Sequence, residues 1–386
     1  MSPADSDPVR PADSDPVRPA QSDPGRPGQS DPDSARPSVS VVMAVRDEQA
    51  HLGRALDAVL AQDYAGLLEV CVAVAPSHDG TEELAREVAA RDRRVAVTAN
   101  PRGVTPAGLN AAIAATSGDV VVRVDGHAVL PPGYVRRAVE LLAETGADNV
   151  GGIMAAEGDT PFTRAVAAAM TSRFGTGDAR FHTGGRPGPV DTVYLGVFRR
   201  AALERVGHFD ERLVRTQDAE LNHRIRQSGG QVWFHPDLRV AYRPRDSLRG
   251  LARQYFEYGR WRRAVVRRHP DSLALRQLAP PAALVGTVAG AALGLTALAG
   301  RSGLTGPAGR TRPAGGTLGR APERVRALAL AGWVAPLGYL LAVLGASAAA
   351  GRGLEPGARL RLPLVFATMH GCWAVGFLTS PRDLGT

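Results

Sequence analysis

Short apolar runs alternate with amphipathic stretches over the chain that follows an opening polar segment. The β-branched run VSVVMAV begins at Val39, and apolar residues at Leu52, Leu56 and Val59 follow it at helical spacing. Such a run predicts a buried strand, and the spacing after it predicts an amphipathic helix. Further strands are expected at 68–74, 95–98 and 120–124. This alternation predicts an α/β fold with a doubly wound, mostly parallel sheet, whose ligand site lies beyond the carboxyl ends of the strands.

Two helix starts are predicted from capping chemistry. Thr81 is expected to cap a helix whose first turn carries Glu82 and Glu83, because acidic side chains are favoured at the positive end of a helix. Thr105 is expected to cap the next helix, with Pro106 in the first turn, a position where proline is tolerated well.

The pattern weakens between about Met154 and Val190, where Gly, Thr and Arg predominate. This composition predicts a mobile substrate loop, with a surface spacer as the alternative. Periodicity returns in RTQDAELNHRIRQSGG, whose apolar positions predict a helix. Glu220 and Arg224 stand four residues apart in it, so they are expected to pair.

A basic aromatic segment and three apolar segments make up the carboxyl-terminal part. Residues 247–270 interleave arginine with aromatic side chains, which predicts an interfacial helix against anionic headgroups. The alternative is a solvated basic helix packed on the preceding domain. Nucleic-acid binding is disfavoured because no nucleic-acid motif accompanies the segment. Residues 278–300 and 327–351 lack charged side chains and are long enough to cross a bilayer, and 362–380 is a shorter third candidate.

Domain boundaries follow from these shifts in composition. Residues 1–37 contain the repeat PADSDPVR and a Pro/Asp/Ser-rich composition that predicts a disordered tail. They lack a secretory signal, so the amino-terminal portion is expected in the cytoplasm. An α/β domain (38–246), the interfacial helix (247–276) and a membrane region (277–386) follow. If the catalytic domain is cytoplasmic and all three apolar segments cross the membrane, the arginine-bearing loop 301–326 lies on the outer side. That placement runs against the tendency of positively charged loops to stay in the cytoplasm.

Composition limits the partners more than the fold. The 386 residues are 44% hydrophobic, which is enough for the buried core of an enzyme. Basic residues, all of them arginine, number 46 against 38 acidic ones, a net charge of +8 that fits nucleic acid, anionic lipid or phosphorylated substrates. Cys71 and Cys372 lie far apart in apolar runs and predict buried free thiols, without a disulfide or metal cluster.

Three segments carry candidate chemistry. In RVDGHA, Asp125 ends a strand and His127 follows, so a carboxylate there can hold Mg²⁺ or Mn²⁺ against a diphosphate; a turn-forming aspartate is the alternative. Asp218 begins a helix and can take a proton from an attacking hydroxyl, unless it is only a helix-start acid. In QYFEYGRW, Arg260 and Trp261 suit a phosphate and a sugar ring, or else anchor the helix at an interface.

The order of the motifs resembles that of glycosyltransferase family 2. VRDE, SHDGT, TPAGLNAAI, RVDGHA, FDE, TQDAELNHRI and GRW occur in sequence, and from Val39 onward the chain is similar to the succinoglycan-biosynthesis type of membrane enzyme in that family. The resemblance implies a GT-A fold, a UDP-, GDP- or dTDP-sugar donor, Mn²⁺ or Mg²⁺, and inversion by a single displacement. It also implies a saccharide or polyprenyl-linked acceptor of the cell envelope or an exopolysaccharide, and a multi-pass membrane enzyme with a cytoplasmic catalytic domain.

The resemblance assigns roles to individual residues. Asp218 would be the general base, and Asp125 with His127 would hold the metal. The residues expected at the donor are Val45, Arg46, Glu48, Asp79, Arg102, Asn110 and Asp125. The residues expected at the acceptor, or in an element that closes over it, are Gln217, Glu220, Gln254, Arg260 and Trp261.

Three positions depart from the family pattern. Val74, Ala75 and Pro76 replace the acid that commonly contacts uracil, His127 occupies the third position of the DxD motif, and the spacing from Gln254 to Arg260 exceeds that of the QxxRW element of processive members. Two other function classes are compatible with such a fold. A non-catalytic membrane partner would retain the fold without turnover, and a nucleotidyltransferase is disfavoured because VMAVRDE lacks a glycine-rich phosphate loop.

Overall fold

The structure, a computed structural model, describes residues 36–66, 68–299 and 323–385. The predicted disordered tail lies outside the described residues except at its last two positions, and so does most of the arginine-bearing loop 301–326.

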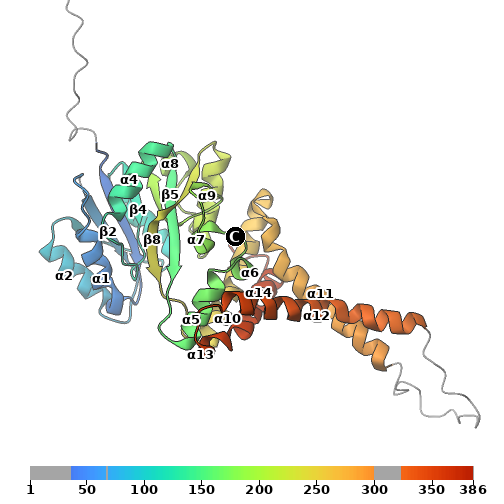
Figure 1. Ribbon diagram of the computed structural model, residues 1–386. Helices are drawn as coiled ribbons and strands as arrows, with labels where there is room; N and C mark the ends of the chain where they lie inside the picture. The colour runs from blue at the N-terminus through green and yellow to red at the C-terminus, as the bar shows by residue number, and fades with distance from the viewer. Residues whose placement is uncertain (1–35, 67, 300–322, 386) are drawn as a thin grey trace, which may run out of the picture. The chain divides into compact units, whose positions relative to one another are not determined.

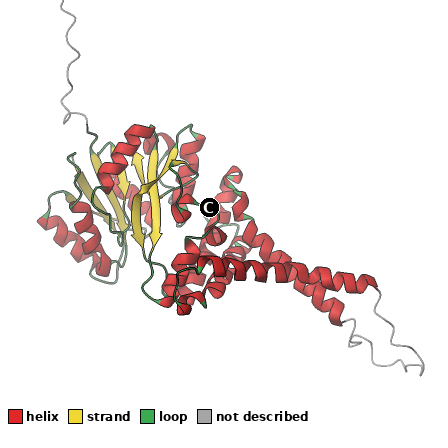
Figure 2. Ribbon diagram, in the orientation of Figure 1, coloured by secondary structure: helices red, strands yellow, loops and turns green. Residues whose placement is uncertain are grey.

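Within the described residues, eight strands form one mixed sheet in the order β3-β2-β1-β4-β7-β5-β8-β6. Figure 2 shows the strands of this sheet in yellow, with helices packed beside them. The strands are β1 Val39–Val45, β2 Leu68–Val74, β3 Val95–Ala99, β4 Val120–Arg123, β5 Asn149–Ala156, β6 Gly188–Pro189, β7 Tyr194–Arg199 and β8 Val232–Tyr242. Strands β1 to β4 pair in parallel, whereas β7 runs antiparallel to β4 and β5. The predicted α/β sheet is confirmed, and β7 brings the start of its strand to the edge where β1 and β4 end.

Helices cover the sheet and continue beyond it (Figure 1). Those of the α/β part are α1 Gln49–Leu60, α2 Thr81–Arg91, α3 Thr105–Ala114, α4 Tyr134–Thr145, α5 Pro161–Met170, α6 Arg173–Thr176, α7 Arg180–Thr183, α8 Arg200–Val206 and α9 Gln217–Gln227. The later ones are α10 Leu248–Arg268, the 3₁₀ turns Pro270–Ser272 and Leu275–Gln277, α11 Ala279–Ala299, α12 Glu323–Ala350, α13 Pro356–Arg359 and α14 Leu362–Thr379.

The two predicted threonine caps are wrong by one position. Gly80 and Val104 occupy the cap positions, and Thr81 and Thr105 are the first helical residues. The Thr81 hydroxyl is used elsewhere, because it accepts a hydrogen bond from the backbone N–H of Glu48 at 2.8 Å. It therefore joins the start of α2 to the loop that follows β1.

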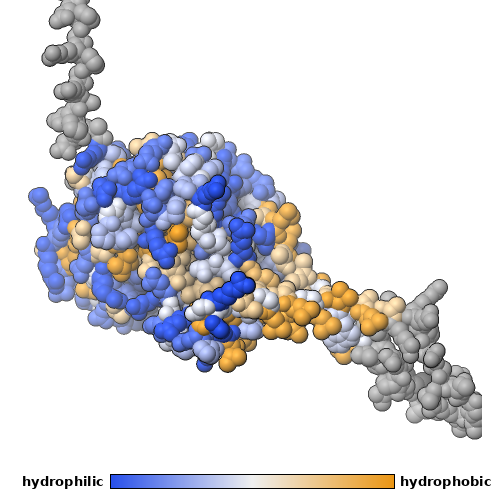
Figure 3. Space-filling model, in the orientation of Figure 1, coloured by the Kyte–Doolittle hydropathy of each residue, from blue (hydrophilic) through white to orange (hydrophobic). Residues whose placement is uncertain are grey.

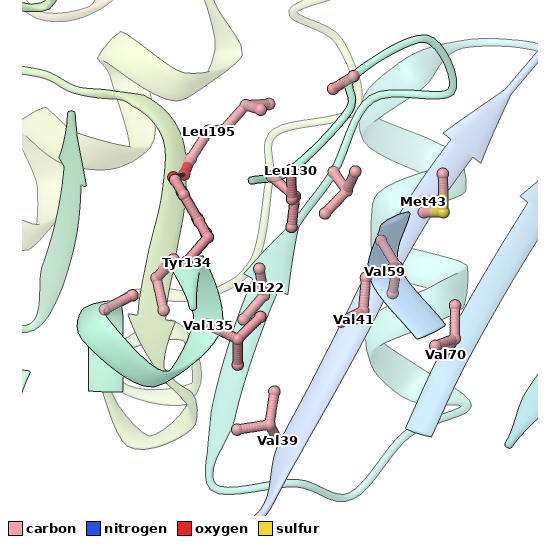
Figure 4. Close-up of a cluster of buried hydrophobic side chains, with 14 of the residues drawn as sticks. Val39, Val41, Met43, Val59, Val70, Val122, Leu130, Tyr134, Val135 and Leu195 are labelled. Carbon is pink, nitrogen blue, oxygen red and sulfur yellow. Dashed lines mark hydrogen bonds between the residues drawn. The ribbon is translucent and has the colours of Figure 1, made fainter. Parts of the chain in front are cut away.

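Apolar side chains fill both faces of the sheet. On one face, Val41, Met43 and Val122 from neighbouring strands pack under α1 and α4 (Figure 4). On the other, α3 and α9 cover a second cluster that contains Cys71. Cys71 and Cys372 are free thiols, as predicted; Cys71 is buried, which raises its pKa to about 11, whereas Cys372 is only partly buried. The core thus places the strand ends rigidly at one edge.

The prediction of a mobile loop over 154–190 is wrong. The segment contains the end of β5, three helices and β6. Helix α5 begins with a capping box in which Thr160 and Thr163 bond reciprocally, and it buries Val166 and Met170 against the carboxyl-terminal helices. Its partners lie far away in sequence, which explains why local composition did not reveal this order.

Helix α10 packs closely against α14 (Figure 1). A Cβ atom on Gly259 would lie 2.1 Å from the carbonyl oxygen of Trp373, and one on Gly376 would lie 2.1 Å from that of Phe256. The two glycines therefore allow backbone contact between the helices. Helix α10, which was predicted to be interfacial, is half-buried, with Leu251 and Val265 on its inner face.

Gly259→Ala is expected to lower the stability of the protein by about 1–3 kcal/mol, because the added methyl group forces α10 away from α14. The measurement is thermal unfolding of the detergent-solubilised protein. Gly371→Ala in α14 is the matched control, since no atom of the described residues outside its own stretch of helix would lie within 4 Å of the new methyl group. Equal unfolding temperatures for the two variants would contradict the close packing.

Three helical segments have the length and composition to cross a membrane: Leu275–Thr296, Leu330–Ala350 and Pro356–Thr379. They correspond to the three predicted apolar segments. The first two are 11% buried and the third is 39% buried, because α14 packs on α10 and α5. Figure 3 shows apolar surface along α11 and α12, where Val288 and Leu330 are exposed. These two helices therefore present the larger unpartnered apolar surface.

Candidate active site

A cleft of about 500 Å³ opens at the edge where β1 and β4 end. The loop after β1 contributes Val45, Arg46 and Glu48, and the loop after β4 contributes Asp125 and His127. The opposite wall comes from the start of α9 with Gln217 and Asp218, and from Gln254 of α10. These eight predicted residues are therefore brought together, whereas Asp79, Arg102, Asn110, Glu220, Arg260 and Trp261 do not line the cleft.

Arg123 connects the two candidate acids. It is the last residue of β4, its side chain is 8% exposed, and its Nη2 donates to Oδ1 of Asp125 at 2.9 Å. Its Nη1 donates to Oδ1 of Asp218 on α9. Burial by itself would lower the pKa of Arg123, but the charges of Asp125 and Asp218 outweigh burial and raise it. The guanidinium thus holds two distant carboxylates over one point of the cleft.

The loop after β4 is also tied to the loop after β1. Nδ1 of His127 lies 2.8 Å from Oε1 of Glu48. This hydrogen bond raises the pKa of His127, against the opposing effect of burial. Because Nδ1 is engaged, Nε2 is the ring nitrogen left to face a ligand.

Asp79 organises the first loop from outside the cleft. Its carboxylate accepts from the backbone N–H of Gln49 at 3.1 Å and from that of Thr81 at 3.0 Å. The hydrogen bond from the Thr81 side chain lowers the pKa of Asp79. Asp79 therefore joins the start of α1, which directly follows Glu48, to the start of α2.

Arg102 and Asn110 turn toward the FDE motif. The Asn110 amide donates to the carbonyl of Phe209 at 2.9 Å and to Oε1 of Glu211 at 3.0 Å. Arg102 forms an ion pair with Glu211. Asp210 pairs with Arg268 at the end of α10. The FDE motif thus links α3 to α10 behind the cleft.

Buried contacts fix α9. Glu220 is 2% exposed and bonds Arg224, with Nε to Oε1 at 2.7 Å, which confirms the predicted pair. His269 also contacts Glu220, with Nε2 to Oε1 at 3.1 Å. Glu220 therefore anchors α9 from the side away from the cleft and leaves Asp218 exposed to it.

The predicted closing element divides into two parts on α10. Nε2 of Gln254 donates to the hydroxyls of Tyr242 and Tyr258, both at 2.9 Å, at the cleft wall. Arg260 and Trp261 lie farther along and both bond Glu257, at 2.9 and 3.1 Å. Arg260 and Trp261 therefore hold α10 through Glu257 and do not line the cleft.

Several residues that line the cleft were not predicted from the sequence. Arg123 carried a usable signal, since a charge inside the apolar run VVVRV must be paired when buried. Arg215 and Arg245 add exposed cations to the rim, and nothing in the local pattern singled them out. His182, on α7, lines the cleft from the region whose composition predicts a loop, and burial lowers its pKa to about 4.

Backbone strain concentrates beside the cleft. Within the described part of the chain, the residues other than glycine with positive φ are Asp47 at 52°, Leu195 at 46° and Thr216 at 60°. Each is a cleft residue or a direct neighbour of one. Such conformations cost about 1–3 kcal/mol each and persist where the surrounding structure enforces them, which is common at functional sites.

Asp125 suits a cation that is shared with a phosphate-bearing ligand. Among the described residues, no group of three or more His, Cys, Asp or Glu side chains is arranged to hold a metal alone. Mg²⁺ sites commonly take one or two carboxylates and complete their coordination with phosphate oxygens and water. Asp125 fits this donor set, because Oδ2 has no hydrogen-bond partner within the described residues while Oδ1 accepts from Arg123.

Comparison with known proteins identifies the family to which this chain belongs. The family described as glycosyltransferase-like family 2 matches residues 37–264. The chain is 35% identical over 213 residues to succinoglycan biosynthesis protein ExoA of Rhizobium meliloti (strain 1021), covering 55% of this chain and 64% of that protein. It is 27% identical over 231 residues to glycosyltransferase AglE of Haloferax volcanii, covering 59% and 73%. The alignment therefore spans less than two thirds of the first relative.

A solved structure shares the fold. The mannosyltransferase PcManGT from Pyrobaculum calidifontis, in complex with GDP-Man and Mn²⁺, superposes with a TM-score of 0.52 at 18% identity. The superposition covers 90% of this chain and 87% of that one, so it includes the helices beyond the sheet.

Proposed function

Because the chain belongs to the glycosyltransferase-like family 2, we propose that it is an inverting transferase that moves a sugar from a nucleotide-sugar donor to an acceptor hydroxyl. The acceptor is a saccharide of a polysaccharide or a lipid-linked saccharide. The likeness to a protein named for succinoglycan biosynthesis supports a product in the cell envelope or an exopolysaccharide.

One observation carries the proposal: Arg123 holds Asp125 and Asp218 at the same cleft. An inverting transferase needs two groups at one carbon, one beside the leaving diphosphate and one beside the attacking hydroxyl. Asp125 lies in the loop after β4, on the side assigned to the donor, and Asp218 lies in the first turn of α9 on the opposite wall. The pair therefore supplies both groups within one site.

The reaction is a single displacement. The acceptor oxygen forms a bond to the anomeric carbon as the bond from that carbon to the diphosphate oxygen breaks, and the electron pair leaves with the nucleoside diphosphate. Asp218 takes the hydroxyl proton as general base. Its Oδ1 is held by Arg123, so Oδ2 is the atom assigned to the proton.

Donor binding falls to the loops after β1 and β4. Val45, Arg46 and Glu48 line the nucleotide side, and Asp125, with His127 beside it, would hold Mn²⁺ or Mg²⁺. A bound cation would neutralise charge on the departing diphosphate. Asp79, Arg102 and Asn110 act as positioning residues through the loop contacts described above. Gln217 and Gln254 face the acceptor side, while Glu220, Arg260 and Trp261 hold α9 and α10.

The membrane is the proposed location, with the α/β domain on the cytoplasmic side. The exposed apolar residues of α11 and α12 support the membrane location, because such a surface needs a nonaqueous environment. Helix α14 is assigned to a position nearer the membrane surface than α11 and α12, since it packs on α10 and α5.

The test is metal-dependent hydrolysis of UDP-, GDP- and dTDP-sugars by the detergent-solubilised protein. At least one donor is expected to be hydrolysed, and the response to added Mn²⁺ is expected to disappear in Asp125→Ala, because that side chain is the proposed ligand. Asp57→Ala, an exposed acid on α1 outside the cleft, is the matched control and should retain the response.

Two outcomes would count against the proposal. An unchanged metal response in a folded Asp125→Ala protein would remove its assigned role. Absence of both binding and hydrolysis for every donor would favour a non-catalytic membrane partner instead.

A further inference from the structure

Two further cavities adjoin the cleft. One measures about 180 Å³ and the other about 480 Å³. Thr192 and Ala219 line both of them and also the cleft, so all three spaces meet beside α9. We call the smaller one the arginine pocket and the larger one the apolar cavity. A single ligand with three chemically different parts can therefore occupy them together.

The apolar cavity lies among the helices beyond the sheet. Phe174 of α6, Tyr255 of α10, and Met369 and Trp373 of α14 form much of its wall. Pro280 of α11 lines it as well, so the cavity borders one of the candidate membrane spans. An apolar chain fits these surroundings.

Among the described residues, three arginines but only two carboxylates, Asp191 and Asp271, line the arginine pocket, so its positive charge is not fully balanced. Arg276 binds Asp178, with Nη1 to Oδ1 at 2.8 Å, and also binds Asp191. Arg226 and Arg262 line the same pocket, and neither forms an ion pair within the described residues. Arg262 is also partly withdrawn from water, and burial lowers its pKa to about 10. Arg262 donates through Nη2 to the backbone carbonyl of Ser272, but a partly buried guanidinium without a carboxylate partner is costly unless an anion joins it.

Unsatisfied polar atoms point to the same conclusion. Nε of Arg262, Nδ1 of His223 and the hydroxyl of Ser272 are buried without a hydrogen-bond partner in the described part of the chain. His223 is 3% exposed. All three residues line the arginine pocket. Buried polar groups are normally satisfied, so three orphans around one cavity indicate a polar ligand that completes them.

We propose that the arginine pocket binds the phosphate of a lipid-phosphate-linked saccharide, with the lipid chain in the apolar cavity and the terminal sugar in the cleft at Asp218. The inference rests on the proposed transferase activity, and it names the class of acceptor. The arginine pocket and the apolar cavity are direct neighbours, since Arg262, Arg276 and Gln277 line both of them. A phosphate attached to a lipid chain fits this adjacency. The donor diphosphate is assigned to the cleft, which shares only Thr192 and Ala219 with the arginine pocket.

The test measures the binding of farnesyl phosphate to the full chain in detergent. The readout is the change in tryptophan fluorescence, to which Trp373 in the wall of the apolar cavity contributes. Arg262→Gln is expected to weaken this binding at least about tenfold, since it removes a charged hydrogen-bonding group. Arg226→Gln should weaken it in the same direction, and Arg226 is exposed, so that variant keeps the fold. Arg253→Gln, an exposed arginine on α10 outside both cavities, is the matched control and should bind as the unmodified protein does.

Comparison ligands separate the possible sources of the signal. Farnesol, which lacks the phosphate, should bind weakly and equally to all variants, and inorganic phosphate should bind weakly because it leaves the apolar cavity empty. Equal farnesyl phosphate binding by the unmodified protein, Arg262→Gln and Arg226→Gln would overturn the assignment. Equally tight, Arg262-dependent binding of phosphatidylglycerol would overturn it in favour of a membrane headgroup.

The two proposals fail in different ways. Donor hydrolysis without Arg262-dependent farnesyl phosphate binding would leave the transferase standing and reject the acceptor class. Arg262-dependent binding without any donor hydrolysis would support the lipid-phosphate pocket and reject the transferase.

Discussion

Asp218→Asn is expected to lower the turnover number for sugar transfer by about 10³-fold, within the range that general-base catalysis supplies. The asparagine oxygen can still accept from Arg123, so the wall of the cleft is retained, but the amide cannot take the proton of the acceptor hydroxyl. Donor binding should change little, since Asp218 lies on the acceptor side. The measurement is release of nucleoside diphosphate with saturating donor and acceptor.

Glu83→Gln is the matched control for this substitution. Glu83 lies in the first turn of α2, as Asp218 does in α9, but outside the cleft. If Asp218 were only a helix-start acid, the two variants would show the same small effect. Full turnover in Asp218→Asn would therefore reject it as the base.

Arg123→Met is expected to lower the free energy of unfolding by about 3 kcal/mol and to abolish turnover. Removing one partner of a buried ion pair costs about 3–5 kcal/mol, and the lower end applies because Asp125 and Asp218 stay partly exposed. The methionine also leaves two carboxylates at one site without their shared counter-ion. Denaturant unfolding of the solubilised protein measures the stability.

Two further variants separate charge from packing. Arg123→Lys should recover part of the stability but little activity, because a single ammonium cannot bridge both carboxylates as a planar guanidinium does. The double variant Arg123→Met with Asp218→Asn should be more stable than Arg123→Met alone, because one of the unpaired charges is gone. Unfolding at the same denaturant concentration for the original protein and Arg123→Met would show that the contact carries no stability.

The four strands β1 to β4 were predictable because each is encoded locally, whereas β5 to β8 were not predicted. VSVVMAV and LEVCVAV predicted β1 and β2 at the residues where the structure has them. The order within 154–190 was not predictable in this way, because α5 is stabilised by α13 and α14, which lie about two hundred positions later in the chain. Local patterns cannot report a helix whose partners are that distant.

The site shows the same division. Asp125 and Asp218 stood out from motifs, and the structure brings both to the cleft. Their link through Arg123 needed the fold, although the lone arginine in VVVRV was a hint. Arg102 and Asn110 were expected beside the donor, but their hydrogen bonds run to the FDE motif, which no linear spacing indicates.

The contact of Gly259 with α14 has a mechanical consequence. Gln254 stands on the wall of the cleft only five positions before Gly259, within the same rigid helix. No flexible side chain separates the backbones of α10 and α14 at that crossing, so there is nothing soft to absorb movement. A tilt of α14 would therefore displace α10 as well, and with it Gln254 on the wall of the cleft.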